Sequence, residues 1–254
     1  MSQAHNPIQG QGTPSEAWQR SAQLARVPLI TASELLPPGS HVVVVAPHPD
    51  DEVLACGGLL AQIAWQDVRV SMVAVTDGEA SHPHSAVWPT QLLRRERPRE
   101  SQLALRRLGF SPQDVHWTRL RLDDSQVARD EAYLLDALVQ CIADATHVIS
   151  TWRHDGHCDH EAVGRACAAA VQHQGCQLYE VPVWAWHWAA PEDDRLPWAR
   201  ARKLLLDNDA LGRKQAAIHA HRSQLLADAS TGAEPVLTPT TLARFAQPYE
   251  VFFL

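Results

Sequence analysis

The chain has 254 residues, a formal net charge of -7 and a pI near 6.0, and 45% of its residues are hydrophobic. This length suits one large α/β domain, and the acidic balance argues against nucleic acid or an anionic membrane as a partner. Apolar runs are too short to span a bilayer, and the polar first twenty residues lack a signal-peptide core. Five cysteines without a CxxC pair favour a reducing cytoplasm.

The N-terminal part is predicted to be an arm followed by a short helix. Residues 1 to about 20 are polar, and Trp18 could anchor them to the body. A helix is expected at 29–36, ended by Pro37-Pro38-Gly39. We therefore divide the chain into an arm and helix at 1–38 and one main domain at 39–254.

The stretch from His41 to Leu60 organises the rest of the chain. Its four consecutive valines, 42–45, predict a strand buried on both faces, as in parallel sheets. A cluster of one imidazole and three carboxylates, at 48–52, separates this strand from an apolar helix. Ligands bind at this edge of open α/β sheets, and carboxylates packed so closely repel one another unless a cation is present. The arrangement favours a metal site.

Later segments alternate between strand and helix patterns. We expect strands at 68–75, 115–120, 147–151, 178–184 and 249–254, and helices at 52–65, 91–108, 130–143, about 160–173 and 199–226. Pro98 predicts a kink or a break in the helix at 91–108. The alternation favours a single α/β domain of Rossmann-like type, with a mostly parallel sheet and helices on both faces.

A second polar cluster, 152–160, repeats the topology of the first. It follows a buried strand and precedes an alanine-rich helix, and it contributes three more imidazoles and two more carboxylates. If the two strands are neighbours, both clusters meet at one edge and can hold a divalent metal with an open position. The alternative is that these residues are helix caps and solvated loop residues.

Several short motifs resemble the PIG-L/LmbE-like deacetylases, over roughly residues 40 to 254. His48-Pro49-Asp50-Asp51-Glu52 is similar to the family's AHPDDE signature, and His157-Cys158-Asp159-His160 to its HPDH signature. Thr76-Asp77-Gly78-Glu79, Arg97 with Glu100, and the HRSQ element at 221–224 resemble further family positions. The resemblance implies a metal-dependent enzyme that removes an acetyl group from an N-acetylglucosamine-type sugar or glycoconjugate, leaving a free amine and acetate.

The resemblance also implies roles for individual residues. His48, Asp51 and His160 match the metal ligands, with Zn²⁺ as the expected ion and Fe²⁺ as an alternative in the cell. Asp50 matches the general base. His157 matches the imidazole that stabilises the tetrahedral intermediate or protonates the leaving amine, and Asp159 the carboxylate that orients it. This division of labour suits amide hydrolysis, which needs an activated water, a polarised carbonyl and a protonated amine.

Some positions depart from the family pattern or stay open. Cys158 stands where the family usually has proline, and we expect its thiol to point away from the metal. Asp155 occupies a position where at least one member has a tyrosine implicated in catalysis. Glu52 either caps the following helix or belongs to the site. Arg97, Trp152 and Asp155 are candidate substrate contacts.

A tryptophan-rich segment follows the expected strand at 178–184. Trp184, Trp186 and Trp188 alternate, so on a strand their rings would share one face. Such a row packs into a core or a homo-oligomer interface, or forms a platform for a sugar ring. On the second interpretation, Trp186 or Trp188 contacts the pyranose or its aglycone.

Two other function classes compete with a deacetylase. A non-haem iron enzyme also uses two histidines and one carboxylate, but those ligands usually place His and Asp two positions apart on a strand. A non-catalytic nucleotide-binding Rossmann-like module is suggested by Gly57-Gly58, but no GxGxxG follows the strand. A small N-acetylated sugar is therefore the expected partner, with no nucleic acid and no integral membrane segment.

Overall fold

One eight-stranded sheet forms the centre of the protein. The computed structural model describes residues 8, 10–111 and 113–254. The strand order is β1-β7-β8-β6-β5-β2-β3-β4, and only β8 runs antiparallel to its neighbours. The bounds are β1 Leu29–Ile30, β2 Ser40–Ala46, β3 Val68–Thr76, β4 Val115–Leu122, β5 His147–Thr151, β6 Gln177–Val181, β7 Ala201–Leu205 and β8 Tyr249–Phe253. The mostly parallel α/β sheet is confirmed.

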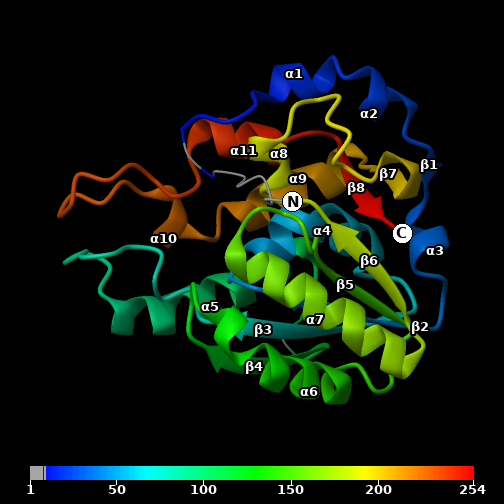
Figure 1. The fold of residues 1–254 in the computed structure, drawn as a ribbon, viewed down its shortest axis with the longest axis horizontal. Coiled ribbons are helices and arrows are strands. Elements are labelled where there is room, and N and C mark those ends of the chain that lie inside the picture. The colour runs from blue at the N-terminus through cyan, green and yellow to red at the C-terminus, as the bar shows by residue number, and fades with distance from the viewer. Residues whose placement is uncertain (1–7, 9, 112) are drawn as a thin grey trace, which may run out of the picture.

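Helices cover both faces of the sheet (Figure 1). One face carries α4 (Asp51–Ile63), α5 (Thr90–Leu108) and α9 (Asn208–Ile218), and the other carries α6 (Glu131–Cys141) and α7 (Cys158–Gln174). The valines of β2 divide between the two cores: Val42 and Val44 pack in the first, and Val43 and Val45 in the second. β2 is therefore buried on both faces, as its sequence predicted.

Short helices complete the fold around the sheet ends. They are α1 (Ser15–Gln19), α2 (Ala22–Arg26), α3 (Ala32–Leu35), α8 (Ala185–Trp188), α10 (Arg222–Leu225), α11 (Pro239–Phe245) and the 3₁₀ turns η1 (Val127–Asp130) and η2 (Trp198–Arg200). The loops at 81–89 and 226–236 project from the same side of the molecule (Figure 1), and Ser230 Oγ accepts a hydrogen bond from the backbone N–H of Ala86 at 2.9 Å.

A buried ion pair supports the helix that starts at the first motif. α4 is broken at Cys56, whose φ of -141° and ψ of 23° are not helical. Glu250 accepts hydrogen bonds from the freed backbone N–H groups of Gly58 and the next residue, at 2.6 and 2.8 Å. Lys214 donates to the carbonyl of Leu54 at 3.2 Å and to Glu250 at 2.7 Å. The pair therefore satisfies the backbone groups that the break exposes on both sides.

Several predicted elements differ from the structure. The helix expected at 199–226 is wrong over 201–205, where β7 pairs with β1 and β8. The helix expected at 29–36 begins with strand β1, and only Ala32–Leu35 is helical. Pro98 lies inside α5, so the chain forms one helix there rather than two, and the predicted kink stays a prediction. Local patterns could not show the pairing of β7 because its partners are distant in sequence.

The predicted anchor of the N-terminal arm is present. Trp18 is buried, and its Nε1 donates a hydrogen bond to the carbonyl of Trp186 at 2.9 Å. Residues 1–7 and 9 of the predicted arm lie outside the described residues. The division of the chain at residue 38 remains a prediction.

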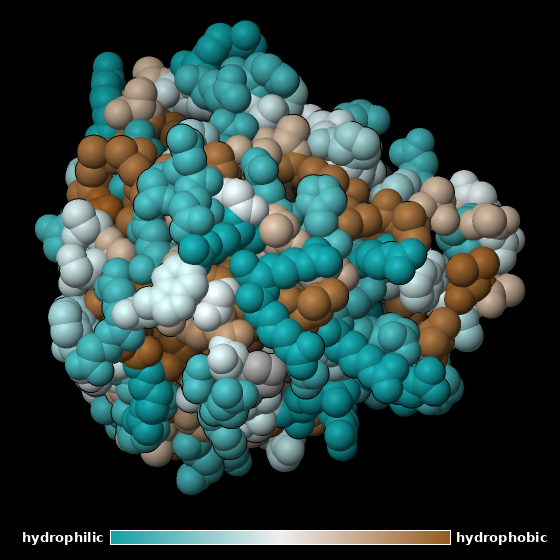
Figure 2. Space-filling view, turned by 180° about the vertical axis from the view of Figure 1, so that it is seen from behind, coloured by the Kyte–Doolittle hydropathy of each residue, from teal (hydrophilic) through white to brown (hydrophobic). Residues whose placement is uncertain are grey.

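The surface seen from behind is mostly hydrophilic. Figure 2 shows hydrophobic residues on this face in separate patches between hydrophilic ones. Among the described residues, no helix is long and apolar enough to cross a membrane.

Candidate active site

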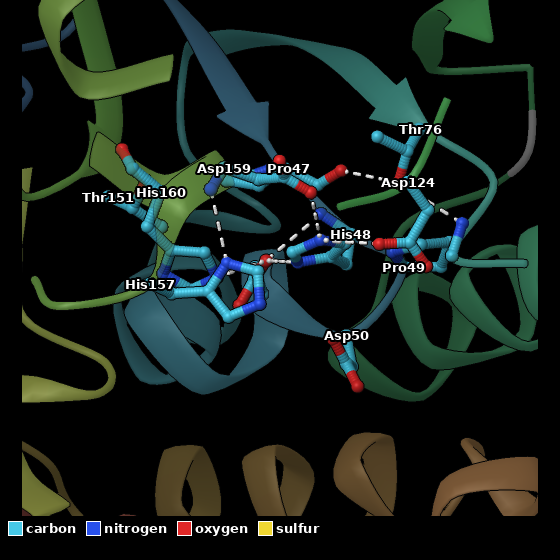
Figure 3. A network of polar contacts seen from close by, with 12 residues as sticks. Pro47, His48, Pro49, Asp50, Thr76, Asp124, Thr151, His157, Asp159 and His160 are labelled. Atoms are coloured by element: carbon cyan, nitrogen blue, oxygen red, sulfur yellow. Dashed lines mark hydrogen bonds and ion pairs between the residues drawn. The ribbon is translucent and has the colours of Figure 1, made fainter. Parts of the chain in front are cut away.

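The two polar clusters of the sequence meet at the carboxyl edge of the sheet. β2 and β5 are parallel neighbours, with Val45 opposite Ser150. The loop after β2 leads into α4, and the loop after β5 leads into α7, so both motifs end at helix N-termini. Thr76, at the end of β3, holds the first loop through two hydrogen bonds to the carbonyl of Pro47, at 3.1 and 2.9 Å. Figure 3 shows these residues around one centre.

The two predicted histidine ligands, His48 and His160, both lie close to one carboxylate oxygen of the third predicted ligand, Asp51. Oδ2 of Asp51 lies 3.2 Å from Nδ1 of His48 and 3.2 Å from Nε2 of His160. Nε2 of His160 is fully buried and has no hydrogen-bond partner among the described residues. Buried polar atoms nearly always have a partner. An unsatisfied imidazole nitrogen beside a carboxylate and a second imidazole therefore fits a divalent metal.

In both His48 and His160, carboxylates contact the ring nitrogen that faces away from Asp51. Nδ1 of His160 lies 2.8 Å from Oδ2 of Asp155, and Nε2 of His48 lies 3.0 Å from Asp159 and 3.2 Å from Asp124. Metal-ligating histidines usually donate their other N–H to such a carboxylate, which fixes the ring and raises its basicity. This outer set of contacts supports His48 and His160 as ligands through the nitrogens that face Asp51.

Neighbouring carboxylates raise the pKa values of His48 and His160. Burial lowers the pKa of His48, but hydrogen bonds to Asp124, Asp159 and Asp51 outweigh it and raise that pKa well above its ordinary value. Burial also lowers the pKa of His160, but Asp51 and Asp155 raise it to about 9. Burial opposes ionisation of Asp51, yet His160 and His48 hold its pKa well below the usual range.

Other combinations of side chains overlap this centre. Donor atoms of His48, His157 and His160 lie within 4.8 Å of one another, as do those of His48, Asp124 and Asp159. A third group, His157, Cys158 and Asp159, has donor atoms equally close together. Each of these groups shares a residue with each of the others, so all of them describe the same region. Cys158 is exposed, and its Sγ lies near the carbonyl of Ser125 and Oδ1 of Asp159, at 3.9 and 3.7 Å.

Asp50 lies beside the cluster formed by His48, Asp51 and His160, but its side chain points away from His48 (Figure 3). Its carboxylate accepts a hydrogen bond from Arg97 at 3.1 Å, and its backbone N–H donates to Glu52 at 3.0 Å. Its φ of 135° is rare for a residue with a side chain. Burial raises the pKa of Asp50 to about 7, against the lowering effect of Arg97. A carboxylate with such a pKa can accept a proton near neutral pH.

Arg97 lines the pocket and also holds the first motif in place, and its contact with a substrate stays a prediction. It is buried, and its guanidinium also donates to the carbonyls of Gly78 and Pro49, both at 2.7 Å. Gly78 has a φ of +67°, and a Cβ there would overlap the Arg97 guanidinium. This explains the glycine of the Thr76–Glu79 motif. Glu52 hydrogen-bonds to the N–H of Asp50, so it supports the loop as well as standing in the first turn of α4.

His157 is held by backbone rather than by a carboxylate. Its Nδ1 accepts a hydrogen bond from the backbone N–H of Asp159 at 3.2 Å, so a neutral ring carries its proton on Nε2. Burial, followed by His160 and His48, lowers the pKa of His157 to about 3. The Asp159 carboxylate instead contacts His48 and the N–H groups of Ser125 and Val127. The Asp159 carboxylate still acts on His157 through its charge, and its role in orienting that ring stays a prediction.

A pocket of about 140 Å³ opens over these residues. It is lined by His48, Asp50, Asp51, Leu54, Ala80, Ser81, Arg97, Asp124, Ser125, His157, Val183, Trp184, His187, Gln224, Val236, Leu237, Thr241, Arg244 and Phe245. The predicted ligands His48 and Asp51 and the predicted base Asp50 share this wall, while His160 is buried behind it.

The predicted tryptophan platform differs from the structure. Residues 185–188 form helix α8 rather than a strand, and Trp184, not Trp186 or Trp188, lines the pocket. Trp184 stacks on His157 with ring centroids 6.3 Å apart. Trp186 packs edge-on against Trp18, and Trp188 donates its Nε1 hydrogen bond to the carbonyl of Asp155 at 2.6 Å.

Two further candidate substrate contacts, Trp152 and Asp155, are not among the residues that line the pocket. Trp152 is buried and packs against Trp188 and Phe253. Asp155 is fully buried, and besides His160 it accepts hydrogen bonds from three consecutive backbone N–H groups, at 183–185. These bonds turn the chain at the start of α8, which explains why the strand pattern fails there.

Sequence reasoning missed Asp124 and the C-terminal part of the pocket wall. Asp124 follows β4, whose carboxyl end lies at the same sheet edge, so its place after a strand was a usable signal. The residues at 236–245 carry no motif, and only the tertiary structure brings them to the pocket.

Comparison with known proteins gives a consistent family. The model of the PIG-L family, described as GlcNAc-PI de-N-acetylase, matches residues 43–171. A probable N-acetyl-alpha-D-glucosaminyl L-malate deacetylase 2 of Bacillus cereus is 30% identical over 141 residues, covering 52% of this chain and 60% of the relative. A 1D-myo-inositol 2-acetamido-2-deoxy-alpha-D-glucopyranoside deacetylase of Mycobacterium sp. is 27% identical over 240 residues and 76% of each chain.

The fold is shared with solved structures. The crystal structure of a deacetylase in the biosynthesis pathway of teicoplanin superposes with a TM-score of 0.62 at 18% identity, over 84% of this chain and 97% of the other. The Bacillus match spans only 60% of that relative's length. The family model covers both strand-end motifs and half of the sequence, and the chain belongs to the PIG-L family.

Proposed function

We propose that the protein is a metal-dependent hydrolase that removes the N-acetyl group from an N-acetylglucosamine-type sugar or glycoconjugate. The observation that carries this proposal is the convergence of His48, Asp51 and His160 beside Asp50, at the wall of one pocket. Family membership supports a deacetylase over a non-haem iron enzyme or a nucleotide-binding module. The names of the relatives support an amino-sugar substrate.

His48, Asp51 and His160 would hold the metal, and Zn²⁺ suits two imidazoles and one carboxylate. A bound divalent ion would polarise the acetyl carbonyl and lower the pKa of a water molecule. Asp155, Asp159 and Asp124 hold the two imidazole rings in place from behind. Fe²⁺ remains the alternative ion in the cell.

Asp50 would take the proton of the attacking water. It lines the pocket, and its pKa of about 7 makes the carboxylate a base matched to neutral pH. Arg97 donates to one of its oxygens and fixes the direction of the carboxylate. The proton that Asp50 gains can then be delivered to the nitrogen of the leaving amine.

His157 would stabilise the negative charge that develops on the acetyl oxygen. With Nδ1 occupied by the N–H of Asp159, the neutral ring presents Nε2–H as a donor. Its lowered pKa favours this neutral role over that of a charged proton donor. Trp184, stacked on the ring, limits its movement and forms the adjoining pocket wall.

The reducing cytoplasm also remains a proposal, which the five unpaired cysteine thiols support. A homo-oligomer is likewise kept as a proposal from the aromatic content of the sequence, and its test is the mass of the protein in solution.

The function is tested by incubating metal-loaded protein with methyl N-acetyl-α-D-glucosaminide and measuring free amine and acetate. Wild type should release both in equal amounts, and Asp50→Asn should lose turnover by ~10²-fold or more while keeping the metal. Asp136→Asn, an exposed residue on α6, is the matched control and should retain full turnover. Near-normal hydrolysis by Asp50→Asn would show that Asp50 is not the base.

A further inference from the structure

The pocket wall contains a buried cation that the proposed chemistry does not use. Arg244, on α11, lines the pocket and is 6% exposed. Its Nε donates to the carbonyl of Thr13 at 2.7 Å, its Nη1 contacts Nδ1 of His187 at 3.2 Å, and its Nη2 donates to the carbonyl of Gln11. Two of these partners are backbone carbonyls and the third is an imidazole nitrogen, so none is a carboxylate.

Other buried cations of the protein are neutralised. Arg97 pairs with Asp50 at 3.1 Å, and Lys214 pairs with Glu250 at 2.7 Å. Among the described residues, no carboxylate lies within ion-pair distance of Arg244. The undescribed positions, 1–7, 9 and 112, contain no Asp or Glu in the sequence. The described part of the chain therefore offers the Arg244 charge no carboxylate as a counter-ion.

A buried charge without a counter-ion is unfavourable, because desolvation is not offset by attraction. Burial accordingly lowers the pKa of Arg244. Arg244 also ties the segment at 11–13 to α11, but a neutral donor could make the same bonds to carbonyls. The charge itself is explained if a ligand brings an anion into the pocket.

The hydrogen-bond capacity of the guanidinium agrees with this. An arginine side chain has five N–H donors, and the three contacts above occupy one on Nε, one on Nη1 and one on Nη2. One N–H remains on each terminal nitrogen. Carboxylate and phosphate groups accept from such a pair of nitrogens, often through two oxygens.

The surroundings of Arg244 in the pocket are otherwise apolar or uncharged, with Leu237, Thr241 and Phe245 on the same part of the chain. The carboxylates of the pocket, Asp50, Asp51 and Asp124, belong to the metal end of the proposed chemistry. An anion would be repelled by these groups and attracted by Arg244, so the wall gives the ligand a preferred orientation.

We infer that the substrate is an N-acetylated amino sugar that also carries an anionic group, a carboxylate or a phosphate, and that Arg244 binds this group. The inference rests on the proposed function, since it deepens the substrate class of the same pocket. Arg244 would then select the aglycone or the sugar substituent, while the acetamido group lies toward Asp50 and His157.

The test compares three N-acetyl-α-D-glucosaminides: the carboxymethyl glycoside, its uncharged carboxamidomethyl counterpart, and the 1-phosphate. Wild type should prefer at least one anionic substrate by about tenfold or more in kcat/KM, mainly through a lower KM. The carboxymethyl and phosphate results distinguish the two anion types. Equal kcat/KM for all three substrates would overturn the inference while leaving the deacetylase activity intact.

Two variants separate the charge of Arg244 from its structural contacts. Arg244→Gln should bring the ratio of anionic to neutral kcat/KM close to one. Thr13→Ala loses the hydrogen bond from Oγ1 to the carbonyl of Ala189 and loosens the same segment without removing the charge, so it should keep the preference. Retention of the preference in Arg244→Gln, or its loss in Thr13→Ala, would contradict the assignment.

A binding measurement makes the inference independent of turnover and of variant stability. By calorimetry, wild type should bind carboxymethyl α-D-glucosaminide, the free-amine product, about tenfold more tightly than the carboxamidomethyl product. If no substrate is hydrolysed but this preference is found, the proposed reaction fails and the anion site stands. Equal binding of the two products overturns the anion site.

Discussion

Oδ2 of Asp51 lies 3.2 Å from Nε2 of His160, although the two residues come from separate motifs at the ends of β2 and β5. The imidazole nitrogen has no hydrogen bond among the described residues, while its other nitrogen is held by Asp155 at 2.8 Å. This relationship favours the proposed ligand set over a group of helix-capping residues.

Replacing His160 by Ala should remove most of the bound metal while leaving the protein folded. The variant loses one of three proposed ligands, and a hydrolytic metal site with two remaining protein ligands binds weakly. His173→Ala, at an exposed position of the same helix, is the matched control. Elemental analysis after dialysis should show about one metal ion per chain in the control. Full occupancy in His160→Ala would remove His160 from the ligand set.

Asp155 should act on the metal without contacting substrate. Asp155→Asn weakens the acceptor for His160 Nδ1 and disturbs the bonds to the N–H groups at 183–185. Metal affinity should fall by ~10- to 100-fold, as expected for a partner behind a ligand. The thermal midpoint should also fall. Titration calorimetry measures the first effect and calorimetric melting the second. Unchanged metal affinity with a lower midpoint would assign Asp155 a purely structural role.

Metal affinity should increase as the pH rises. In the metal-free protein the pKa of His160 is about 9 and that of His48 lies well above its ordinary value, so protons compete with the metal for both rings. A metal ion must displace these protons when it binds. Below these pKa values, the metal affinity should therefore rise by up to about tenfold per displaced proton for each unit of increasing pH. The increase should level off above about pH 9. Calorimetry in buffers of different ionisation enthalpy counts the released protons.

The metal affinity should be measured between about pH 6 and about pH 8, a range near the ordinary pKa of histidine. If it does not change there, the rings of His48 and His160 are already neutral. The carboxylates around His48 would then not hold a proton on it, and the direction of its pKa shift would need another account.

Trp184 and Trp188 should behave differently when truncated. Trp184 lines the pocket and stacks on His157, so Trp184→Ala should raise KM and lower kcat. Trp188 is bonded to the carbonyl of Asp155 and packs with Trp152, so Trp188→Ala should mainly lower stability, by ~3 kcal/mol or more. Steady-state kinetics and denaturant unfolding separate the two effects. If KM rises only in Trp188→Ala, then Trp188 contacts the sugar, as the sequence predicted, and Trp184 does not.

Much of the site could be predicted because its chemistry is concentrated in two short motifs at strand ends. The valine run of β2 and the polar residues after it are local signals, and parallel neighbours bring such ends together. Asp124 has no motif around it, and its contact with His48 depends on the position of β4 two strands away in the sheet.

The remaining errors have a common physical cause. Trp184, Trp186 and Trp188 alternate as in a strand, but hydrogen bonds from 183–185 to Asp155 turn the chain into α8. The segment at 201–205 has a helical pattern, but pairing with β1 and β8 makes it a strand. In both cases contacts distant in sequence override the local pattern.

The most direct test of the account is the fate of water oxygen in acetate. Metal-loaded protein is given methyl N-acetyl-α-D-glucosaminide in ¹⁸O-labelled water, and the acetate is analysed by mass spectrometry. We expect one labelled oxygen per acetate and one free amine per acetate from the loaded enzyme, and neither product after chelation, with activity restored by Zn²⁺. Equal acetate release from the chelated protein, or release of amine without labelled acetate, would contradict a metal-dependent hydrolysis at the centre formed by His48, Asp51 and His160.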